Sequence, residues 1–467
     1  MLTELIESLR DDDPRPALAG SATRGDLARL LRAYARALHD EGLTAGDTLG
    51  LAVRPGPRSL AAMLAAYHLG LRIAVLDPTA GPDVLLARLS LAPPRLVLAD
   101  AAAQAVSGWA APLARRAHLA LPDLGAVAPV RTIGRRLPGS APRLRCGPGS
   151  LPRAYAGDGD AVIVFTSGTT SSPRAVVHTR ASLSAGMAAV RDLVRPAPGT
   201  PVVGGTFFVL LPSLAAGAPV AFPRGRALRK LHPQATYLTP PQLRAALAAG
   251  VRFTGRVYSG SAPVSASLLA AVRRAGASEA WGVYALTELF PAAAVESSAK
   301  AAFEGSGDLV GDLLPGVSAE ICAGQVMLRG PAMADRYLGS PPLERVATGD
   351  AGLITDGRLV LGGRQKDMIL RRAENIYPGL YEPMLHVPGV ELALLVGVPA
   401  GDGDERVVAV VQTAPGVPEQ RVRACLRTPI SRMGTARPDA VVFARIPLAG
   451  RSRKPDRAAT ARLAASA

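Results

Sequence analysis

The stretch VIVFTSGTTSSPRAVVHT at residues 162–179 leads from an apolar run into nine residues, of which six are serine or threonine. An apolar run that is followed closely by Gly and Pro indicates a buried strand ending in a loop. Backbone N–H groups and small hydroxyl side chains can converge in such a loop, which suits phosphate oxygens. The stretch lacks the G-x-x-x-x-G-K-[ST] pattern of a Walker loop, so by itself it also fits a solvated turn.

Strand and helix signals alternate on both sides of this loop. Residues 23–38 predict a helix, because Thr23 and Asp26 form a capping pattern ahead of apolar residues at helical spacing. Short apolar runs at 48–53 and 96–100 predict buried strands between helices. Because strands and helices alternate along the chain, we expect an α/β fold.

The pattern changes toward the end of the chain. Residues 306–364 contain short alternating strands with Gly turns, and residues 365–467 contain the signals of a compact α+β unit. We therefore predict a large N-terminal domain at 1–364, made of α/β subdomains and a small β-rich subdomain, and a small C-terminal domain at 365–467. Residues 121–157 are rich in Pro, Gly and Arg and are expected to be a surface connection.

The composition excludes some classes of protein. The net charge is +16, but the basic residues are spread along the chain without interleaved aromatic residues, so we expect no nucleic-acid partner. No apolar run is long enough for a membrane span, and the N-terminus lacks a signal pattern, so we expect a cytoplasmic protein. The three cysteines have no metal-type spacing and are expected to be reduced, buried thiols.

Lysine is rare in this chain. Of the 53 Lys and Arg residues only four are lysine, namely Lys230, Lys300, Lys366 and Lys454. A chain that otherwise uses arginine is expected to keep lysine where a compact ammonium group is needed.

Further short motifs follow the loop in a fixed order. They read SGSAP at 259–263, WGVYALTE at 281–288, ATGD at 347–350, GGRQKDMIL at 362–370, ENIYP at 374–378 and PLAGRSRKPDR at 447–457. Together with the loop they resemble the signatures of the adenylate-forming superfamily, which includes acyl-CoA synthetases, luciferases and peptide-synthetase adenylation domains. The resemblance covers essentially the whole chain.

The resemblance implies a binding site for ATP. The residues expected to bind the nucleotide are Thr166, Ser167, Gly168, Thr169, Thr170, Arg174, Gly260, Ser261, Ala262, Tyr284, Asp350 and Arg364. The first six would hold phosphates, and the next three would line the adenine pocket, on which Tyr284 would stack. Asp350 would accept the ribose hydroxyls, which suits a carboxylate because it is an acceptor only. Arg364 would contact ribose or phosphate.

The resemblance also implies the residues that carry the chemistry. Thr287 would contact phosphate, and Glu288 would be a Mg²⁺ ligand, since a carboxylate beside a triphosphate is useful only through a cation. Lys454 takes the place of the catalytic lysine, where it would stabilise developing charge. Lys366 takes the hinge position, around which the small domain would rotate between two half-reactions. Two of the four lysines thus fall on motif positions.

The expected reaction begins with a carboxylic acid that attacks the α-phosphate of ATP, which releases pyrophosphate and leaves an acyl-adenylate. Coenzyme A is the first candidate for the second nucleophile. A carrier-protein thiol, an amine, or ring closure by a β-hydroxyl remain alternatives. The oligomeric state is left open between monomer and homodimer. A weakly catalytic nucleotide-binding homologue is the alternative from a different class.

The chain departs from the family pattern at several positions. Serine, arginine and alanine stand at Ser171, Arg174 and Ala175, where the family loop has Gly, Lys and Gly, and Ala285 replaces another glycine. Arginine keeps the charge and adds a planar fork, so phosphate binding can survive.

Two further segments bear on the substrates. RRA at 371–373 stands where coenzyme A ligases often have S-G-G, which either narrows the path of the thiol or attracts coenzyme A phosphates. Phe207, Phe208 and Gly282 are the candidate residues of an apolar acyl pocket, with core packing as the alternative for the phenylalanines. TFFVLLPSLAAG at 206–217 and TELFPAAA at 287–294 look like the β-lactone synthetase branch.

Overall fold

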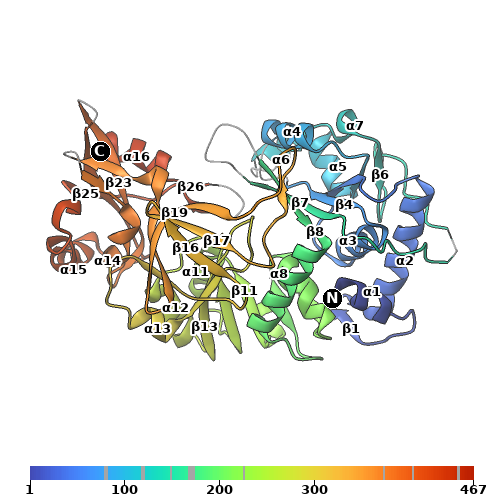
Figure 1. Cartoon of the computed structure of the whole chain (residues 1–467), viewed down its shortest axis with the longest axis horizontal. Helices are drawn as coiled ribbons and strands as arrows, with labels where there is room; N and C mark the ends of the chain where they lie inside the picture. Colours follow the sequence, from blue (N-terminus) through green and yellow to red (C-terminus); the bar gives the residue numbers. More distant parts are fainter. Residues whose placement is uncertain are drawn as a thin grey trace. The chain divides into compact units, whose positions relative to one another are not determined.

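The computed structural model describes residues 1–77, 82–116, 121–147, 150–166, 174–223, 227–371, 374–401, 404–449 and 453–467 (Figure 1). The contacts of the chain divide it into two compact units. Unit 1 consists of Met1–Tyr237, Thr287–Phe290 and Pro331–Glu344. Unit 2 consists of Leu238–Leu286, Pro291–Gly330 and Arg345–Ala467.

Unit 1 alternates helices and strands, as the sequence predicts. Its helices include α1 (Leu2–Ser8), α2 (Arg24–Asp40), α3 (Pro57–Leu69), α4 (Pro82–Leu91), α5 (Ala101–Ser107), α6 (Ala111–Arg116), α7 (Leu124–Val127), α8 (Arg180–Val194), α9 (Phe207–Ala215) and α10 (Ala227–Lys230). Its strands include β1 (Pro16–Leu18), β2 (Ala22–Thr23), β3 (Thr48–Ala52), β4 (Arg72–Val75), β5 (Leu96–Ala99), β6 (Val130–Thr132), β7 (Asp160–Thr166), β8 (Arg174–Thr179), β9 (Val202–Gly204), β10 (Val220–Ala221), β11 (Ala235–Leu238) and β18 (Arg336–Tyr337).

A seven-stranded sheet organises one half of unit 1, with the order β18-β8-β7-β4-β3-β5-β6. The strands from β7 to β6 in this order are parallel, whereas β8 and β18 are antiparallel to their neighbours. All five residues of β3 are buried, which is typical of a parallel strand covered on both faces. A second group of strands in unit 1 has the order β11-β9-β10-β1-β2.

Local sequence signals explain the ends of several helices. Thr23 and Asp26 form the predicted capping box of α2, in which the Asp26 carboxylate accepts from the backbone N–H of Thr23. Helix α3 ends at Gly70, whose φ of 74° lies in the left-handed region that glycine tolerates best. The prediction for residues 121–157 was incomplete, because Val130–Thr132 form β6, which pairs in parallel with β5. Three residues are too few for periodicity to reveal a strand.

Unit 2 contains strands that are mostly antiparallel, together with the C-terminal part of the chain. Its strands include β12 (Arg256–Ser259), β13 (Glu279–Tyr284), β14 (Ala293–Glu296), β15 (Asp308–Leu313), β16 (Ser318–Cys322), β17 (Gln325–Arg329), β19 (Val346–Thr355), β20 (Arg358–Arg364), β21 (Ile369–Arg371), β22 (Glu374–Ile376), β23 (Val390–Gly401), β24 (Asp404–Thr413), β25 (Ala440–Phe443), β26 (Leu448–Ala449) and β27 (Lys454–Pro455). Its helices include α11 (Pro240–Ala248), α12 (Ala266–Arg274), α13 (Ser297–Ala301), α14 (Glu382–Leu385), α15 (Glu419–Ser431) and α16 (Arg457–Ala465), with short 3₁₀ turns at Gln365–Asp367, Pro378–Leu380 and Gly434–Ala436.

The strands of unit 2 before residue 365 follow the order β16-β17-β19-β20-β15-β14-β13-β12. In this run β12 and β13 are parallel to each other, and the other neighbouring strands pair in antiparallel fashion. This confirms the predicted β-rich region at 306–364.

The C-terminal part of unit 2 has cores of its own. Strand β24 sends alternate residues to opposite faces of the sheet β23-β24-β25. Val407, Ala409 and Val411 pack in a cluster with α15, whereas Val408 and Val410 pack in a cluster with α16. The predicted boundary between residues 364 and 365 stays a prediction, because the chain on both sides of it belongs to unit 2.

The predicted α/β fold class is confirmed. Of the three thiols expected to be buried, Cys146 and Cys425 are exposed and Cys322 is only half-buried, so the expectation of burial was wrong. All three cysteines are free. In the described part of the chain, no helix combines the length and the apolar character needed to cross a membrane.

Candidate active site

The segment Thr287–Phe290 carries two of the predicted catalytic residues, and its backbone is fixed within unit 1. The carbonyl of Thr287 lies 2.8 Å from Nε2 of His178, and the carbonyl of Glu288 accepts from the N–H of Ala334 at 2.7 Å. Leu289 forms an antiparallel bridge with Met333. The main chain on both sides of the Glu288 side chain is therefore held by hydrogen bonds.

His178 supports this segment from β8, and no motif in the sequence predicts it. Its side chain is completely buried at the end of β8. A carbonyl can only accept, so Nε2 carries the proton and donates to Thr287, while Nδ1 accepts from the Ser182 hydroxyl at 3.3 Å. Burial lowers the pKa of His178, which keeps the ring neutral. The ring also meets Phe290 edge-on, with 5.3 Å between centroids.

The Glu288 carboxylate is oriented by Tyr337, a second residue that no sequence motif predicts. The hydroxyl of Tyr337 donates to Oε1 of Glu288 at 2.9 Å. The guanidinium carbon of Arg174 lies 5.2 Å from the centre of the Tyr337 ring. Burial, together with the Glu288 charge, raises the pKa of Tyr337, so the hydroxyl keeps its proton.

This arrangement fits a Mg²⁺ ligand. Glu288 is a half-buried carboxylate, one oxygen of which is fixed by Tyr337, so the other oxygen can ligate a hard cation. Among the described residues, no group of three or more His, Cys, Asp and Glu side chains could hold a metal ion. Magnesium commonly binds through one or two carboxylates and takes its remaining ligands from phosphates and water.

The phosphate loop is described only at its two ends. Thr166 ends β7 and Arg174 begins β8, and these two residues are directly paired in the antiparallel ladder. Ser167, Gly168, Thr169 and Thr170 lie outside the described residues, as does Ser171. The predicted role of this loop therefore stays a prediction.

Unit 2 brings three predicted nucleotide residues together at Asp350. The hydroxyl of Tyr284 donates to Oδ2 at 2.5 Å, and Nε of Arg364 lies 2.6 Å from Oδ1. The register explains the second contact, because Asp350 and Arg364 are directly opposite each other on β19 and β20. Asp350 is only 5% exposed, and this burial raises its pKa even though the Arg364 charge opposes the shift.

Lys454 belongs to the same group of charges. It lies on β27, where it pairs with Ala449 of β26, and its side chain keeps an exposed surface. The protein around its ammonium group lowers the pKa of Lys454, as do the neighbouring Arg364 and Lys366 charges, whereas Asp350 raises it. The structure therefore brings the predicted catalytic lysine, hinge lysine and ribose-binding carboxylate into one neighbourhood.

Arg457 anchors the segment that carries Lys454. Its Nη1 lies 2.8 Å from Glu382, and its Nε lies 3.3 Å from Asp367, the residue after Lys366. Asp456 caps α16 by accepting from the N–H of Ala459. This ion-pair network explains why the charged residues of the last motif follow its lysine so closely.

The adenine segment follows β12. Gly260 is buried directly after Ser259, and Ser261 has a φ of 70°, which is uncommon for a residue other than glycine. Ala262 is half-buried. A non-glycine residue in this backbone region often marks a functional turn, which agrees with the prediction but does not test it.

The three candidate acyl residues are not brought together by one unit. Phe207 and Phe208 begin α9 in unit 1, whereas Gly282 lies on β13 in unit 2. A Cβ on Gly282 would lie 3.3 Å from the Val295 side chain, so this glycine allows β13 and β14 to pack closely. Phe208 packs on Phe290, with 4.4 Å between ring centroids.

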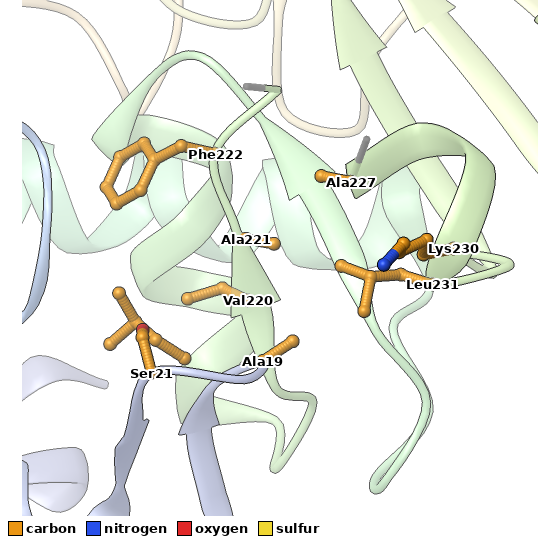
Figure 2. Close-up of a pocket in the computed structure, with 9 residues that line it drawn as sticks. Ala19, Ser21, Val220, Ala221, Phe222, Ala227, Lys230 and Leu231 are labelled. Carbon is orange, nitrogen blue, oxygen red and sulfur yellow. The ribbon is translucent and has the colours of Figure 1, made fainter. Parts of the chain in front are cut away.

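Phe207 contacts a residue that lines a cavity in unit 1. Its ring meets that of Phe222 edge-on, with 6.2 Å between centroids. Phe222 lines a cavity of about 330 Å³ together with β1, β10 and α10 (Figure 2). Among the described residues that line it, Lys230 is the only charged one and most of the others are apolar. The cavity adjoins one predicted acyl residue, but nothing in the sequence predicts it.

Arg371 is held by the C-terminal part of unit 2. Its guanidinium donates to the carbonyls of Thr435 and Arg437, at 2.9 and 2.8 Å, and pairs with Asp439. These residues line a polar cavity of about 500 Å³. Because most of its donors are used internally, Arg371 is a structural residue rather than a free anchor for a phosphate. Arg372 and Ala373 lie outside the described residues.

Comparison with known proteins identifies the class. A family model described as "AMP-binding enzyme" matches residues 10–338. The chain belongs to this family and is an adenylate-forming ligase, a class of enzyme that binds ATP.

Individual relatives show how wide this class is. The chain is 26% identical to an olefin beta-lactone synthetase of Stenotrophomonas maltophilia over 472 residues, covering 85% of this chain and 83% of the relative. It is 29% identical to a feruloyl-CoA synthase of Amycolatopsis over 331 residues, covering 62% and 67%. The structure of the amide bond synthetase McbA from Marinactinospora thermotolerans superposes with a TM-score of 0.80 at 24% identity, covering 99% of this chain and 98% of that one. At this identity the likeness shows the fold.

Proposed function

We propose that this ligase activates a carboxylic acid as its acyl-adenylate, with release of pyrophosphate, and then passes the acyl group to a thiol. The observation that carries the proposal is the group formed by Tyr284, Asp350, Arg364 and Lys454. A buried acceptor-only carboxylate suits the vicinal hydroxyls of a ribose, and the nearby ammonium and guanidinium groups suit phosphate.

Asp350 would hold the nucleotide by its sugar. Each of its oxygens takes one protein partner, which leaves lone pairs for the two ribose hydroxyls. Arg364 and Tyr284 fix the carboxylate, so its orientation is set before the nucleotide binds. Such preorganisation avoids the cost of ordering the group during the reaction.

Lys454 would act at the reacting centre. A carboxylate oxygen of the acid attacks the α-phosphorus, and the bond from this phosphorus to pyrophosphate breaks. Negative charge builds on the α-phosphate and the leaving pyrophosphate as the carboxylate attacks, and the Lys454 ammonium would stabilise it at the α-phosphate. No covalent bond to the enzyme is needed.

Glu288 would hold Mg²⁺, which would neutralise charge on the phosphates when bound. The residues of unit 1 would position this carboxylate: Tyr337 fixes its Oε1, and His178 fixes the preceding carbonyl. Thr287 and Arg174 would contact phosphate oxygens.

The acceptor is proposed as coenzyme A, because the motifs at 362–370 and 374–378 resemble those of coenzyme A ligases. Ring closure of a β-hydroxy acid is the second candidate. It is favoured by the similarity to an olefin beta-lactone synthetase, which covers 85% of the chain.

The test begins with a broad panel of acids in ATP–pyrophosphate exchange. We expect exchange that depends on the acid and on Mg²⁺, and its absence across the panel would rule out both candidates. Mass analysis of the product from each active acid, with and without coenzyme A, then separates a thioester from a lactone.

A further inference from the structure

Three side chains of unit 1 form a continuous chain of contacts that ends at Glu288. Arg174 lies over the ring of Tyr337, and the Tyr337 hydroxyl donates to Glu288. These residues come from three separate segments of the sequence, namely β8, β18 and the segment Thr287–Phe290.

The register of the sheet produces the first contact. Tyr337 is paired with Val176 across β18 and β8. Arg174 precedes Val176 by two residues, so its side chain is on the same face of the sheet and diagonal to Tyr337. Arg174 also closes the ladder opposite Thr166, at the end of the predicted phosphate loop.

The second contact is chemically directed. A carboxylate only accepts hydrogen bonds, and a tyrosine has a single hydroxyl proton to donate. The hydrogen bond from the Tyr337 hydroxyl to Oε1 fixes the rotation of the Glu288 carboxylate. Oε2 is then available to bind a cation. Groups that orient a metal-binding carboxylate in this way commonly matter for metal affinity.

We infer that Tyr337 is a positioning residue that presents Glu288 to the Mg²⁺ of the nucleotide, and that Arg174 holds Tyr337 in place. The inference rests on the proposed function, because it requires Mg·ATP as the substrate. Arg174, which replaces the family's loop lysine, would thus act on the metal-binding carboxylate of Glu288 through Tyr337.

The strand that carries Tyr337 does not need the hydroxyl. The N–H of Asp335 bonds to the Val177 carbonyl at 2.9 Å, and the N–H of Leu338 bonds to the Ala175 carbonyl at 2.8 Å. Tyr337→Phe keeps the ring and these backbone bonds, so the strand is expected to stay paired.

The experiment measures metal binding directly. Mn²⁺, used as the probe for Mg²⁺, is titrated into the full chain with the α,β-methylene analogue of ATP, and free Mn²⁺ is read by electron paramagnetic resonance. We expect Tyr337→Phe to weaken Mn²⁺ binding by about tenfold. Binding of the nucleotide in EDTA is expected to be unchanged. Arg174→Met should weaken Mn²⁺ binding as well, and the two losses should be less than additive.

Two controls separate positioning from general damage. Tyr67→Phe removes a hydroxyl from another Arg–Tyr pair of unit 1, in which the Arg180 guanidinium lies 3.9 Å from the ring centre, and it should leave Mn²⁺ binding unchanged. In a Glu288→Gln background, Tyr337→Phe should cause no further loss, because it acts only through that carboxylate.

The outcomes distinguish the inference from the function on which it rests. Suppose that the unmodified chain binds Mn²⁺ with the nucleotide and that the Mn²⁺ affinity of Tyr337→Phe differs from it by less than twofold. The inference is then wrong and the proposed function stands. The same conclusion follows if Tyr337→Phe weakens Mn²⁺ binding equally in the Glu288→Gln background. If the unmodified chain binds neither the nucleotide nor Mn²⁺, both are wrong.

Discussion

Lys454 shows how a candidate residue can be proposed from sequence while its environment cannot. Its rarity and its motif mark it as the candidate, whereas Asp350 and Arg364 are marked by their motifs alone. The lowered pKa of Lys454 depends first on the protein packed around its ammonium group and then on the charges of Arg364 and Lys366, which lie far from it in the chain, so only the fold reveals it. Tyr337 and His178 escaped prediction for the same reason, since their roles depend on the register of β18 and on the contact with Thr287.

The alkaline limb of activity should report Lys454. In the proposed mechanism the protonated form of Lys454 is the active one, so activity should be lost as pH rises through its pKa in the folded enzyme, which lies below the usual value of 10.5. In a plot of kcat/KM for adenylate formation against pH, the alkaline decrease should therefore have its midpoint at a pH below 10.5. In Lys454→Arg, the alkaline decrease of any remaining activity should move to higher pH. If the decrease stays at the same pH, it belongs to a group other than Lys454.

His178 should make stability depend on pH. Its pKa in the folded state is lowered from 6.5, so the unfolded chain binds a proton in a window where the folded chain does not. Stability should therefore be full above pH 6.5 and fall as pH drops below it, by up to about 1.4 kcal/mol per pH unit for this group. Urea unfolding between pH 7 and 5 measures this slope, which should be smaller in His178→Gln. The pKa of His386 is also lowered, so His386 should maintain part of the dependence of stability on pH in His178→Gln. An equal slope in both proteins would contradict the assignment.

At the scale of elements, the sequence predicts most of the strands and helices because their hydrophobic periods are long enough to read. It does not predict β6 and β18, of three and two residues, which exist only because a neighbouring strand pairs with them. Close packing between elements is also hidden. Helix α8 meets the segment Thr287–Phe290 at Gly186, where an added Cβ would lie 2.8 Å from the carbonyl oxygen of Phe290.

Gly186→Ala tests this packing. Alanine is the better helix former by about 1 kcal/mol, so a helix without this contact would become more stable. The clash with the Phe290 backbone should instead destabilise the protein by about 1–3 kcal/mol. It should also lower pyrophosphate exchange, because Phe290 follows Glu288 by two residues. Thermal unfolding and the exchange rate measure both effects, and a raised melting temperature would contradict the packing argument.

At the scale of the whole molecule, the sequence predicts the α/β class and a small C-terminal domain. The contacts divide the chain differently, because the continuous stretch Arg345–Ala467 belongs to one unit. Motif order alone cannot show this division, since it depends on packing between distant segments.

The predicted domain at 365–467 can be tested as a separate fragment. Its two hydrophobic clusters are built from residues after 368, so it has cores that need no other part of the chain. We expect the fragment to unfold in a single cooperative transition in urea, as domains with their own core do. A gradual, non-cooperative transition would place the domain boundary elsewhere.

The most direct test of the central claim is acid-dependent ATP–pyrophosphate exchange in Lys454→Ala, with Lys230→Ala as the matched control. Both variants remove one of the four lysines, but Lys230 lines the cavity beside Phe222 and has no part in the proposed chemistry. The account predicts that exchange falls by at least about a hundredfold in Lys454→Ala, the usual effect of losing one group that stabilises transition-state charge. Lys230→Ala should retain exchange with the same acid. Equal exchange in the two variants would contradict the claim that this chain forms an acyl-adenylate at Lys454.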